Sequence, residues 1–359
     1  MPLRIAIEPV WRFTRDGEPG SMLVMLDFLY EIRATGKLTR AAERADVSYR
    51  HAWNLIGKWS DFLGCALVER RQGRGTVLTP FGERLVWAGQ RLQARLGPQL
   101  QNLAQELESE INALLPEAGA PVRVHASHGF AVSALRGLLA REAGLQVDFR
   151  YVGNINSPAS LAHGGCDLAG MHLPQGELRQ RSMAVWREVL SPRDHRVIPF
   201  VTREMGLIVR RGNPLGIRAL ADLLRPEVRF VNRDPESGTR MLFDELLAQQ
   251  GLEGTRIQGY PQVEFTHAAV AAYVASGMAD ASFGVEAAAR QFDLDFIPVV
   301  TEDYIFVCHH QSLANPAVQR ILEVMRGQAF RDAIAALPGY AVSEAGQIRG
   351  IDEVFGPLA

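Results

Sequence analysis

Apolar residues in the first quarter of the chain recur at helical spacing and then alternate. Residues 22–35 (MLVMLDFLYEIRAT) have one apolar face, and Gly36 follows as a helix end. Two more helices are predicted at 38–46 and 49–64, and a tight turn between them gives the helix-turn-helix form. Residues 66–85 read as strand, glycine-rich hairpin tip, strand and the start of another helix. The pattern predicts a winged helix-turn-helix.

A long helical segment with an apolar stripe follows the wing. The stripe comprises Leu85, Leu92, Leu96, Leu100, Leu103, Leu107, Ile111 and Leu114. Steps of three, four or seven residues are typical of a helix packed on another helix. This packing is interpreted as dimerisation, and packing within one domain is the alternative. Gly97 and Pro98 interrupt the stripe, so we expect a kink there or two helices.

From Val122 onward, short β runs alternate with helices, which indicates an α/β region with a mostly parallel sheet. A second unit of this kind begins near residue 206, with strands expected at RFVNR, IQGYPQ and ASFGV. Residues 296–308 are expected to cross back to the first lobe. The predicted domains are a winged helix (1–82), a linker or dimerisation helix (83–120) and a two-lobed α/β domain (121–359, second lobe about 206–300).

Composition narrows the class of protein. The 359 residues are 47% hydrophobic and 22% charged, which is ordinary globular composition, and no apolar run reaches the ~18 to 20 residues of a membrane span. The N-terminus has no signal-peptide pattern, and the three cysteines lie far apart, so we expect a cytoplasmic protein without membrane contact.

Between Lys37 and Leu96, eleven Lys and Arg stand against five Asp and Glu, a net of +6. The whole chain carries −2, so the remainder sums to −8. A basic segment on an acidic chain suggests a polyanion partner.

The segments GKLTRAAERADVSYRHAWNLI and LVERRQGRGTVLTPFGERL resemble the DNA-binding domain of the molybdate-responsive ModE family, which is close to the LysR-type winged helix. The resemblance covers roughly residues 22–96 and implies double-stranded DNA with an inverted-repeat site as a partner, read by a homodimer or a tetramer. The first turns of the second helix offer side chains that reach phosphates or base edges. The predicted DNA-binding residues are Thr39, Arg40, Ser48, Tyr49, Arg50, His51, Asn54, Lys58, Arg70, Arg71 and Arg74. The alternative is a winged helix used for protein contacts.

The turn RDPESGTR, residues 233–240, suits an anion. Ser237, Gly238 and Thr239 would stand at a helix N-terminus, where free backbone N–H groups and the positive end of the helix dipole point outward. Arg233 and Arg240 would add forked donors. The alternative is a capped helix whose arginines pair with neighbouring carboxylates.

The chain from about Val122 to the end resembles the periplasmic-binding-protein-like (type II) domain found fused to molybdenum-cofactor biosynthesis proteins and to some regulators. RRGNPLGIRALADLL, RFVNRDPESGTR and GYPQVEFTHAAVAAYVASGMADASFGVEAAA carry this resemblance. It implies a small anionic ligand between two lobes. The predicted ligand-binding residues are Ser127, His128, Asn154, Asn156, Asn232, Arg233, Ser237, Gly238, Thr239, Arg240, His267 and Tyr304.

The resemblance leaves three effectors open: a molybdopterin-type cofactor, molybdate and tungstate. The ModE family senses molybdate through β-barrel domains that this sequence lacks, so the DNA-binding half does not carry that preference over. Control of a molybdenum enzyme such as formate dehydrogenase would fit the association. No covalently bound cofactor is expected.

Catalysis has little support in the residues. The sequence shows no nucleophile beside a base, no acid pair and no spacing typical of metal ligands. His309 and His310 end a strand, where adjacent side chains point to opposite faces, so they are not expected to share a metal. The predicted function is a ligand-responsive transcriptional regulator without enzymatic activity. The alternatives are a cofactor-synthesis or cofactor-binding protein with a DNA-binding appendage, and a transport binding protein.

Overall fold

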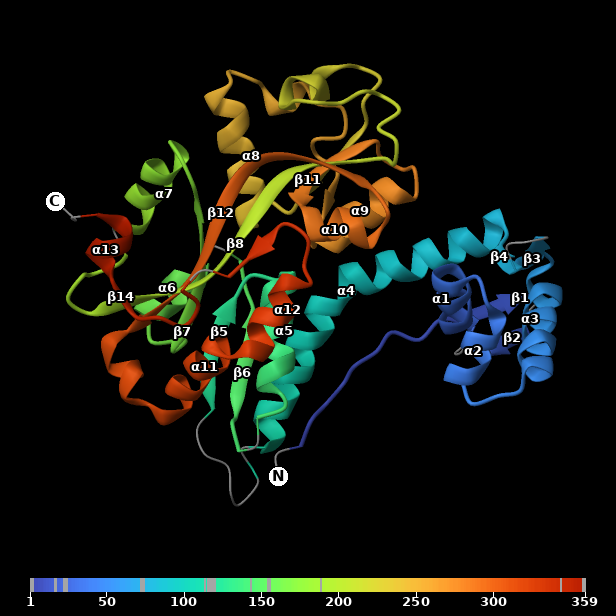
Figure 1. The fold of residues 1–359 in the computed structure, drawn as a ribbon, viewed down its shortest axis with the longest axis horizontal. Coiled ribbons are helices and arrows are strands. Elements are labelled where there is room, and N and C mark those ends of the chain that lie inside the picture. The colour runs from blue at the N-terminus through green and yellow to red at the C-terminus, as the bar shows by residue number, and fades with distance from the viewer. Residues whose placement is uncertain are drawn as a thin grey trace. The chain divides into compact units, whose positions relative to one another are not determined.

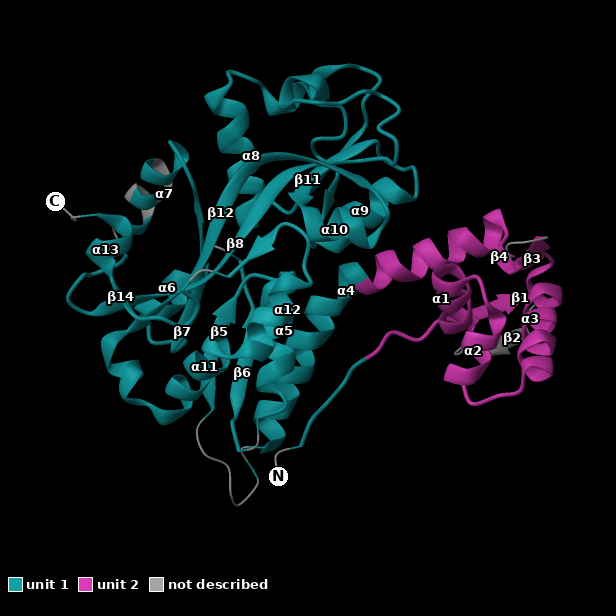
Figure 2. Ribbon diagram, viewed as in Figure 1, with its two compact units in different colours: residues 1–7, 94–359 teal, residues 8–93 magenta. Residues whose placement is uncertain are grey.

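The computed structural model describes residues 3–15, 18–21, 25–71, 75–112, 114, 121–142, 144–153, 156–187, 189–342 and 344–356. The chain divides into two compact units, a smaller one of residues 8–93 and a larger one of residues 1–7 and 94–359 (Figure 2). None of the helices in these described ranges is both long and apolar enough to cross a membrane.

The smaller unit is a winged helix-turn-helix. Its elements are β1 (Arg12–Arg15), β2 (Glu18–Ser21), α1 (Met25–Thr35), α2 (Leu38–Arg44), α3 (Tyr49–Leu63), β3 (Val68–Arg71), β4 (Gly75–Leu78) and the first half of α4 (Pro80–Asn112). Gly36 ends α1 with a φ of 67°, a backbone conformation that glycine adopts without strain. The strands β3 and β4 pair antiparallel as the predicted wing. The β1–β2 hairpin was not predicted.

The core of the smaller unit contains Phe28 and Ile32 from α1, Ile56 and Trp59 from α3, and Leu85 from α4. Leu85 therefore packs inside its own unit and is not part of a surface stripe. For this residue, the alternative of packing within one domain is correct.

Helix α4 (Pro80–Asn112) is a single helix of 33 residues with Pro98 in its interior, so of the two expected outcomes, a kink or two helices, the second is not what the structure shows. Proline lacks the N–H that would bond to the carbonyl four residues earlier. That carbonyl belongs to Ala94, and it accepts a hydrogen bond from the Thr266 hydroxyl at 2.8 Å. A side chain from elsewhere in the fold thus satisfies the acceptor that Pro98 leaves open.

The larger unit is built on one mixed sheet with the strand order β10-β9-β11-β8-β12-β7-β5-β6 (Figure 1). The first lobe contains β5 (Val122–Ala126), α5 (Phe130–Leu139), β6 (Val147–Tyr151), α6 (Asn156–Ala162), β7 (Leu168–Pro174) and α7 (Leu178–Arg187). The second lobe contains β9 (Phe230–Arg233), α8 (Gly238–Gln249), β10 (Val263–Glu264), α9 (His267–Ala275), β11 (Ala281–Val285) and α10 (Glu286–Gln291). The chain closes with α11 (Pro316–Arg326), α12 (Gln328–Ala335), β13 (Tyr340–Ala341), β14 (Arg349–Gly350) and α13 (Ile351–Phe355).

Two long strands, β8 (His195–Val209) and β12 (Asp295–His309), run antiparallel through both lobes. β12 also pairs with β7 of the first lobe, and β8 also pairs with β11 of the second. The predicted return of residues 296–308 to the first lobe is therefore confirmed.

The strand predicted at residues 257–262 is wrong. This segment is a turn, and the strand β10 that follows it has two residues, paired in parallel with β9. Gly259 has a φ of 91°, and Pro261 has no N–H for a sheet ladder, so the segment cannot extend β10 backward.

The three cysteines are all free. Cys65 is exposed in the smaller unit, while Cys166 and Cys308 are buried in the larger one. Burial raises the pKa of Cys166 to about 11 and that of Cys308 to about 12, so both stay thiols at neutral pH.

Candidate ligand-binding and DNA-binding sites

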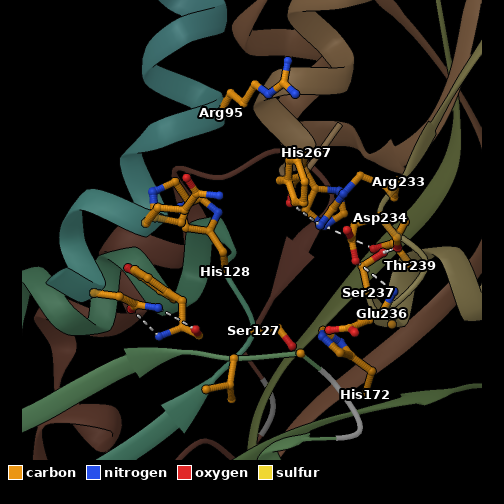
Figure 3. Close-up of a pocket in the computed structure, with 18 of the residues that line it drawn as sticks. Arg95, Ser127, His128, His172, Arg233, Asp234, Glu236, Ser237, Thr239 and His267 are labelled. Atoms are coloured by element: carbon orange, nitrogen blue, oxygen red, sulfur yellow. Dashed lines mark hydrogen bonds between the residues drawn. The ribbon is translucent and has the colours of Figure 1, made fainter. Parts of the chain in front are cut away.

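The larger unit contains a cavity of about 240 Å³ that is lined from three directions (Figure 3). Ser127 and His128 come from the first lobe, and Arg233 and His267 come from the second. The second half of α4, which includes Arg95, supplies the third wall. Sites for drug-sized ligands span ~300 to 1,000 Å³, so this cavity suits a smaller ligand.

Arg233 gives the cavity its most distinctive chemistry. The residue is 5% exposed, and its Nη2 donates to the carbonyl of Phe265 at 3.0 Å. Its Nε and Nη1 have no hydrogen-bond partner among the described residues. Burial, and then the charge of Arg203, lower the pKa of Arg233 to about 9, so the guanidinium remains charged at neutral pH. A buried charge without a counter-ion costs several kcal/mol, and an anionic ligand would supply that counter-ion.

The N-terminus of α8 lies on the same wall. Ser237 caps the helix, since its Oγ accepts from the N–H of Arg240 at 3.2 Å and donates to the carbonyl of Asp234 at 2.7 Å. The backbone N–H groups of Gly238 and Thr239 have no acceptor among the described residues, and both residues line the cavity. Free N–H groups at a helix start are donors for an anion.

The three histidines of the cavity are neutral at pH 7. Burial, followed by the charges of Arg233 and Arg136, lowers the pKa of His128 to about 4. Burial, followed by nearby arginines, also lowers the pKa values of His172 and His267. These rings therefore serve as uncharged hydrogen-bonding groups, as in the 3.4 Å contact of His267 Nε2 with Thr239 Oγ1.

A buried ion pair lies behind the cavity. Arg203 donates to Glu302 through Nε at 2.8 Å and Nη2 at 2.7 Å, and its Nη2 also lies 3.0 Å from His172 Nδ1. The charge of Arg203 is thus paired with Glu302, whereas Arg233 forms no ion pair with a described residue and has only the nearby carboxylate charge of Asp234 acting on it as an opposite charge. Two carboxylates, on Asp234 and the exposed Glu236, lie at the cavity rim. The interior is electropositive, and the rim can accept hydrogen bonds from a ligand.

Seven of the predicted ligand-binding residues line this cavity: Ser127, His128, Arg233, Ser237, Gly238, Thr239 and His267. Four others do not line it, namely Asn156, Asn232, Arg240 and Tyr304. Asn154 lies outside the described residues.

Arg240 was predicted as a clamp, but it does not line the cavity and its mostly buried side chain forms an ion pair with Asp244. Its Nε donates to Asp244 at 2.8 Å, and its guanidinium lies 4.2 Å from the ring centre of Tyr260. Asp244 is four residues further along α8 and therefore on the same helix face. That pairing turns Arg240 away from the cavity.

The other three predicted residues that do not line the cavity have local structural roles or positions that explain this. Asn232 Oδ1 accepts from the N–H of Arg233 at 2.9 Å, so this buried side chain shapes the end of β9. The Tyr304 hydroxyl accepts from the N–H of Ser127 at 3.0 Å and supports the cavity from below. Asn156 is exposed at the start of α6.

Sequence reasoning missed Arg95, Gln99 and Asn102 on α4, together with His172 and Arg203. The three α4 residues follow the spacing i, i+4, i+7 of a single helix face, a signal that was present beside the leucine stripe. His172 and Arg203 lie inside strands, where nothing in the local pattern marks them.

The DNA-binding candidates lie on the surface of the smaller unit. Ser48 caps α3 by accepting from the N–H of His51 at 3.2 Å, and Ser48, Tyr49, Arg50, His51, Asn54 and Lys58 are exposed. Ala52 and Ile56 are buried on the opposite face. Arg50 has no ion pair with any described residue. The helix thus presents polar side chains outward and is fixed by its apolar face.

The base of the wing adds basic groups. Arg70 donates to the Tyr49 hydroxyl at 3.2 Å and lies 4.5 Å from the ring centre of Trp53, so it connects the wing to α3. Thr39, Arg40 and Arg71 are exposed, and the two arginines pair with Glu43 and Glu69. Such exposed pairs are worth little and can be exchanged for phosphates. Arg74 lies outside the described residues.

The expectation that His309 and His310 point to opposite faces is wrong. Their ring centres are 4.6 Å apart, and one ligand atom from each lies within 4.8 Å of the others and of one from Asp194. The strand ends at His309, and a 3₁₀ turn starts at His310, so the alternation of a strand does not extend to the second ring.

Comparisons with known proteins agree with this division of the chain. Residues 136–326 match the PBP superfamily domain, and residues 23–83 match the bacterial regulatory helix-turn-helix protein, lysR family. Since the first match covers more than half of the chain, the chain belongs to the PBP superfamily domain family and carries a lysR-family helix-turn-helix domain.

Two relatives illustrate the sequence similarity. The uncharacterized protein YvgK of Bacillus subtilis is 31% identical over 199 residues, which cover 55% of this chain and 64% of the relative. This chain thus spans less than two thirds of that relative. The DNA-binding transcriptional dual regulator ModE of Escherichia coli is 31% identical over 93 residues, 25% of this chain and 34% of ModE.

Solved structures are matched at low sequence identity. A Corynebacterium glutamicum OxyR mutant with bound H₂O₂ has a TM-score of 0.45 and 17% identity, covering 86% of this chain and 92% of the other. A phosphate transporter substrate-binding protein from Clostridium perfringens has a TM-score of 0.45 and 11% identity, covering 62% of this chain and all of the other.

Proposed function

We propose that this protein is a transcriptional regulator that binds DNA through the smaller unit and senses a small anion in the cavity of the larger unit. The observation that carries the ligand class is the buried guanidinium of Arg233, two of whose nitrogens have no hydrogen-bond partner within the part of the chain that the structure describes. The polar exposed face of α3 and the lysR-family match support the DNA-binding role. Such a protein acts by binding and works in the cytoplasm.

Arg50→Ala should weaken binding to a specific operator by roughly 1 to 3 kcal/mol if Arg50 contacts a base. The side chain is exposed in the first turns of α3, where a recognition helix meets the major groove. Fluorescence anisotropy with an inverted-repeat site from the protein's own promoter, measured at several salt concentrations, gives the loss and the salt slope.

A matched control is Arg44→Ala. Arg44 lies on α2 and pairs with Glu31 at 2.9 Å, away from the N-terminal turns of α3. Equal operator affinity for the Arg50 variant and the parent, with the fold intact, would mean that Arg50 is only solvated.

For the effector, we propose a molybdenum-related anion: molybdate, tungstate or a molybdopterin-type cofactor. The ModE similarity covers a quarter of the chain, so the support for a charged ligand comes from the cavity. An electropositive interior with two N–H groups at a helix start suits an oxyanion. Calorimetry with molybdate and tungstate, beside sulfate and phosphate, tests the class and its selectivity. A molybdenum enzyme such as formate dehydrogenase is the proposed regulatory target.

We further propose that two copies pair through α4. Leu103 is 46% exposed and Ile111 is 41% exposed, whereas Ala104 and Glu108 of the same helix are buried. A second copy would cover these exposed apolar side chains, which are eight residues apart and therefore lie about two turns from each other along one side of the helix.

Replacing both Leu103 and Ile111 with glutamate should raise the dimer dissociation constant by more than about tenfold, because each change removes roughly 1.5 to 3 kcal/mol of apolar burial from the interface. Sedimentation velocity of the full-length protein measures the shift. Glu106→Lys, an exposed change on the same helix, is the control. An unchanged dimer would place the contact elsewhere.

A further inference from the structure

The second half of α4 forms part of the cavity and also bonds to both of the lobes that enclose it. Arg95, Pro98, Gln99 and Asn102 line the cavity. In Figure 3, Arg95 extends from α4 above the space that separates His128 from His267. A linker helix that only joined two domains would not need polar residues on this face.

The bond to the second lobe uses the carbonyl left open by Pro98. The Thr266 hydroxyl donates to the Ala94 carbonyl at 2.8 Å and also accepts from the N–H of Ala269 at 2.9 Å as the cap of α9. Thr266 is 1% exposed and directly precedes the cavity residue His267. One buried hydroxyl therefore connects the start of α9 to α4.

The bond to the first lobe is double. The Asn102 amide accepts from the N–H of Tyr151 at 2.8 Å and donates to the carbonyl of Tyr151 at 2.8 Å. Tyr151 directly precedes Val152 and Gly153, which line the cavity. Both attachments of α4 are thus next to residues that would contact a ligand.

The two attachment points are eight residues apart on α4, or about 12 Å along a helix axis that rises 1.5 Å per residue. The helix bridges the lobes over this length. If the lobes moved toward each other around a ligand, the bond at Thr266 and the pair at Asn102 could not both keep their present geometry. The same helix continues without a break to Pro80, and its residues Leu85 and Val86 belong to the core of the smaller unit.

We propose that α4 belongs to the ligand site: Arg95 and Gln99 contact the bound anion, and the bonds of Thr266 and Asn102 transmit cavity occupancy to the DNA-binding unit through this one helix. The proposal rests on the proposed function and specifies how that function is regulated. The central contact is the bond from the Thr266 hydroxyl to the Ala94 carbonyl, because it makes α4 sensitive to the position of the second lobe.

The first test needs no ligand. Hydrogen–deuterium exchange of the full-length protein is compared for Thr266→Val, which removes the donor, for Thr266→Ser, which keeps it, and for Pro98→Ala. The alanine at position 98 restores an N–H that bonds to Ala94 inside the helix. Thr266→Val should speed exchange in residues 94–103 several-fold, and Thr266→Ser should not. Pro98→Ala should protect that segment and speed exchange at the start of α9. Unchanged exchange in both Thr266→Val and Pro98→Ala would overturn the proposed bridge.

The second test measures coupling. Operator affinity is determined with and without 1 mM molybdate or tungstate, whichever the parent binds. Allosteric coupling of the usual size would change the parent's operator affinity about 5- to 150-fold. Thr266→Val and Pro98→Ala should bring this ratio close to one, while Thr266→Ser keeps it. Gln99→Ala should lower the affinity for the oxyanion itself by about tenfold, which corresponds to the loss of one charge-assisted hydrogen bond.

The outcomes separate the two proposals. A parent that binds none of the oxyanions refutes the proposed oxyanion sensing and the coupling with it, while the exchange data still decide whether the bridge exists. A parent that responds, with variants at positions 98 and 266 that respond equally, refutes the coupling alone.

Discussion

Arg233→Met should reduce oxyanion affinity by about a hundredfold or more and leave the ligand-free protein at least as stable as the parent. The guanidinium is buried, and its Nε and Nη1 have no partner among the described residues. Two charge-assisted hydrogen bonds to an anion would contribute about 1.5 to 3 kcal/mol each, which sets the size of the loss. In the ligand-free state the substitution removes an uncompensated buried charge, and this gain offsets the lost bond to Phe265.

Calorimetry with molybdate or tungstate and a thermal melt of the ligand-free protein measure the two effects. Arg240→Met is the matched control, because Arg240 is paired with Asp244 outside the cavity lining. It should bind the oxyanion as the parent does. If Arg233→Met bound the oxyanion with parental affinity, the anion would have to lie elsewhere.

Glu302→Ala should lower the stability of the larger unit by about 3 to 5 kcal/mol. Glu302 is 1% exposed and is bonded to Arg203 through two nitrogens of the guanidinium. Its removal leaves Arg203 charged, buried and close to Arg233, which is itself uncompensated. For a unit of this size the melting temperature should fall by on the order of 10 °C.

Glu323→Ala is the control, since Glu323 and its partner Arg320 are both exposed. It should shift the melting temperature by little, as expected of a surface pair. A small effect at Glu302 would show that the interior tolerates the unpaired arginine.

The ion pair of Glu302 and Arg203 also makes the stability of the larger unit depend on pH. Burial alone would raise the pKa of Glu302, but Arg203 and His172 outweigh it and hold this pKa at about 2. A carboxyl with a lowered pKa in the folded state stabilises fully above its unfolded pKa, and its contribution is lost as the pH falls through about 2. The parent should therefore keep this contribution at pH 5, and Glu302→Ala should be less sensitive to acid between pH 4 and 2.

Local sequence patterns were sufficient to predict most of the helices and strands and the turn at residues 233–240. Apolar periodicity placed α1, α2 and α3, and the strand–turn–helix pattern placed Ser237, Gly238 and Thr239 at a helix start. The pattern could not decide which of the two flanking arginines enters the cavity. That choice depends on Asp244, which pairs with Arg240 one turn further along α8.

Long-range partners explain most of what was missed. His172 and Glu302 meet Arg203 from positions 31 and 99 residues away, and no local spacing reports such contacts. On α4 the leucine stripe predicted packing against a second copy of the chain. The polar residues Arg95, Gln99 and Asn102, which lie on one face of the same helix, were therefore not considered as ligand contacts. The bond of Thr266 to Ala94 spans 172 residues, and it satisfies the carbonyl that Pro98 leaves without its helical partner.

The three cysteines differ in exposure, so their rates of alkylation can be used to follow the two units of the protein separately. Only a thiolate reacts readily with alkylating reagents, and burial has raised the pKa values of Cys166 and Cys308 out of the reactive range. A maleimide should therefore modify Cys65 alone in the folded chain and place one dye on the DNA-binding unit without any mutation. The other two thiols become alkylated only when the larger unit opens, so their labelling rate counts unfolding events in that unit. An anion that binds the folded cavity would slow this alkylation in proportion to its occupancy.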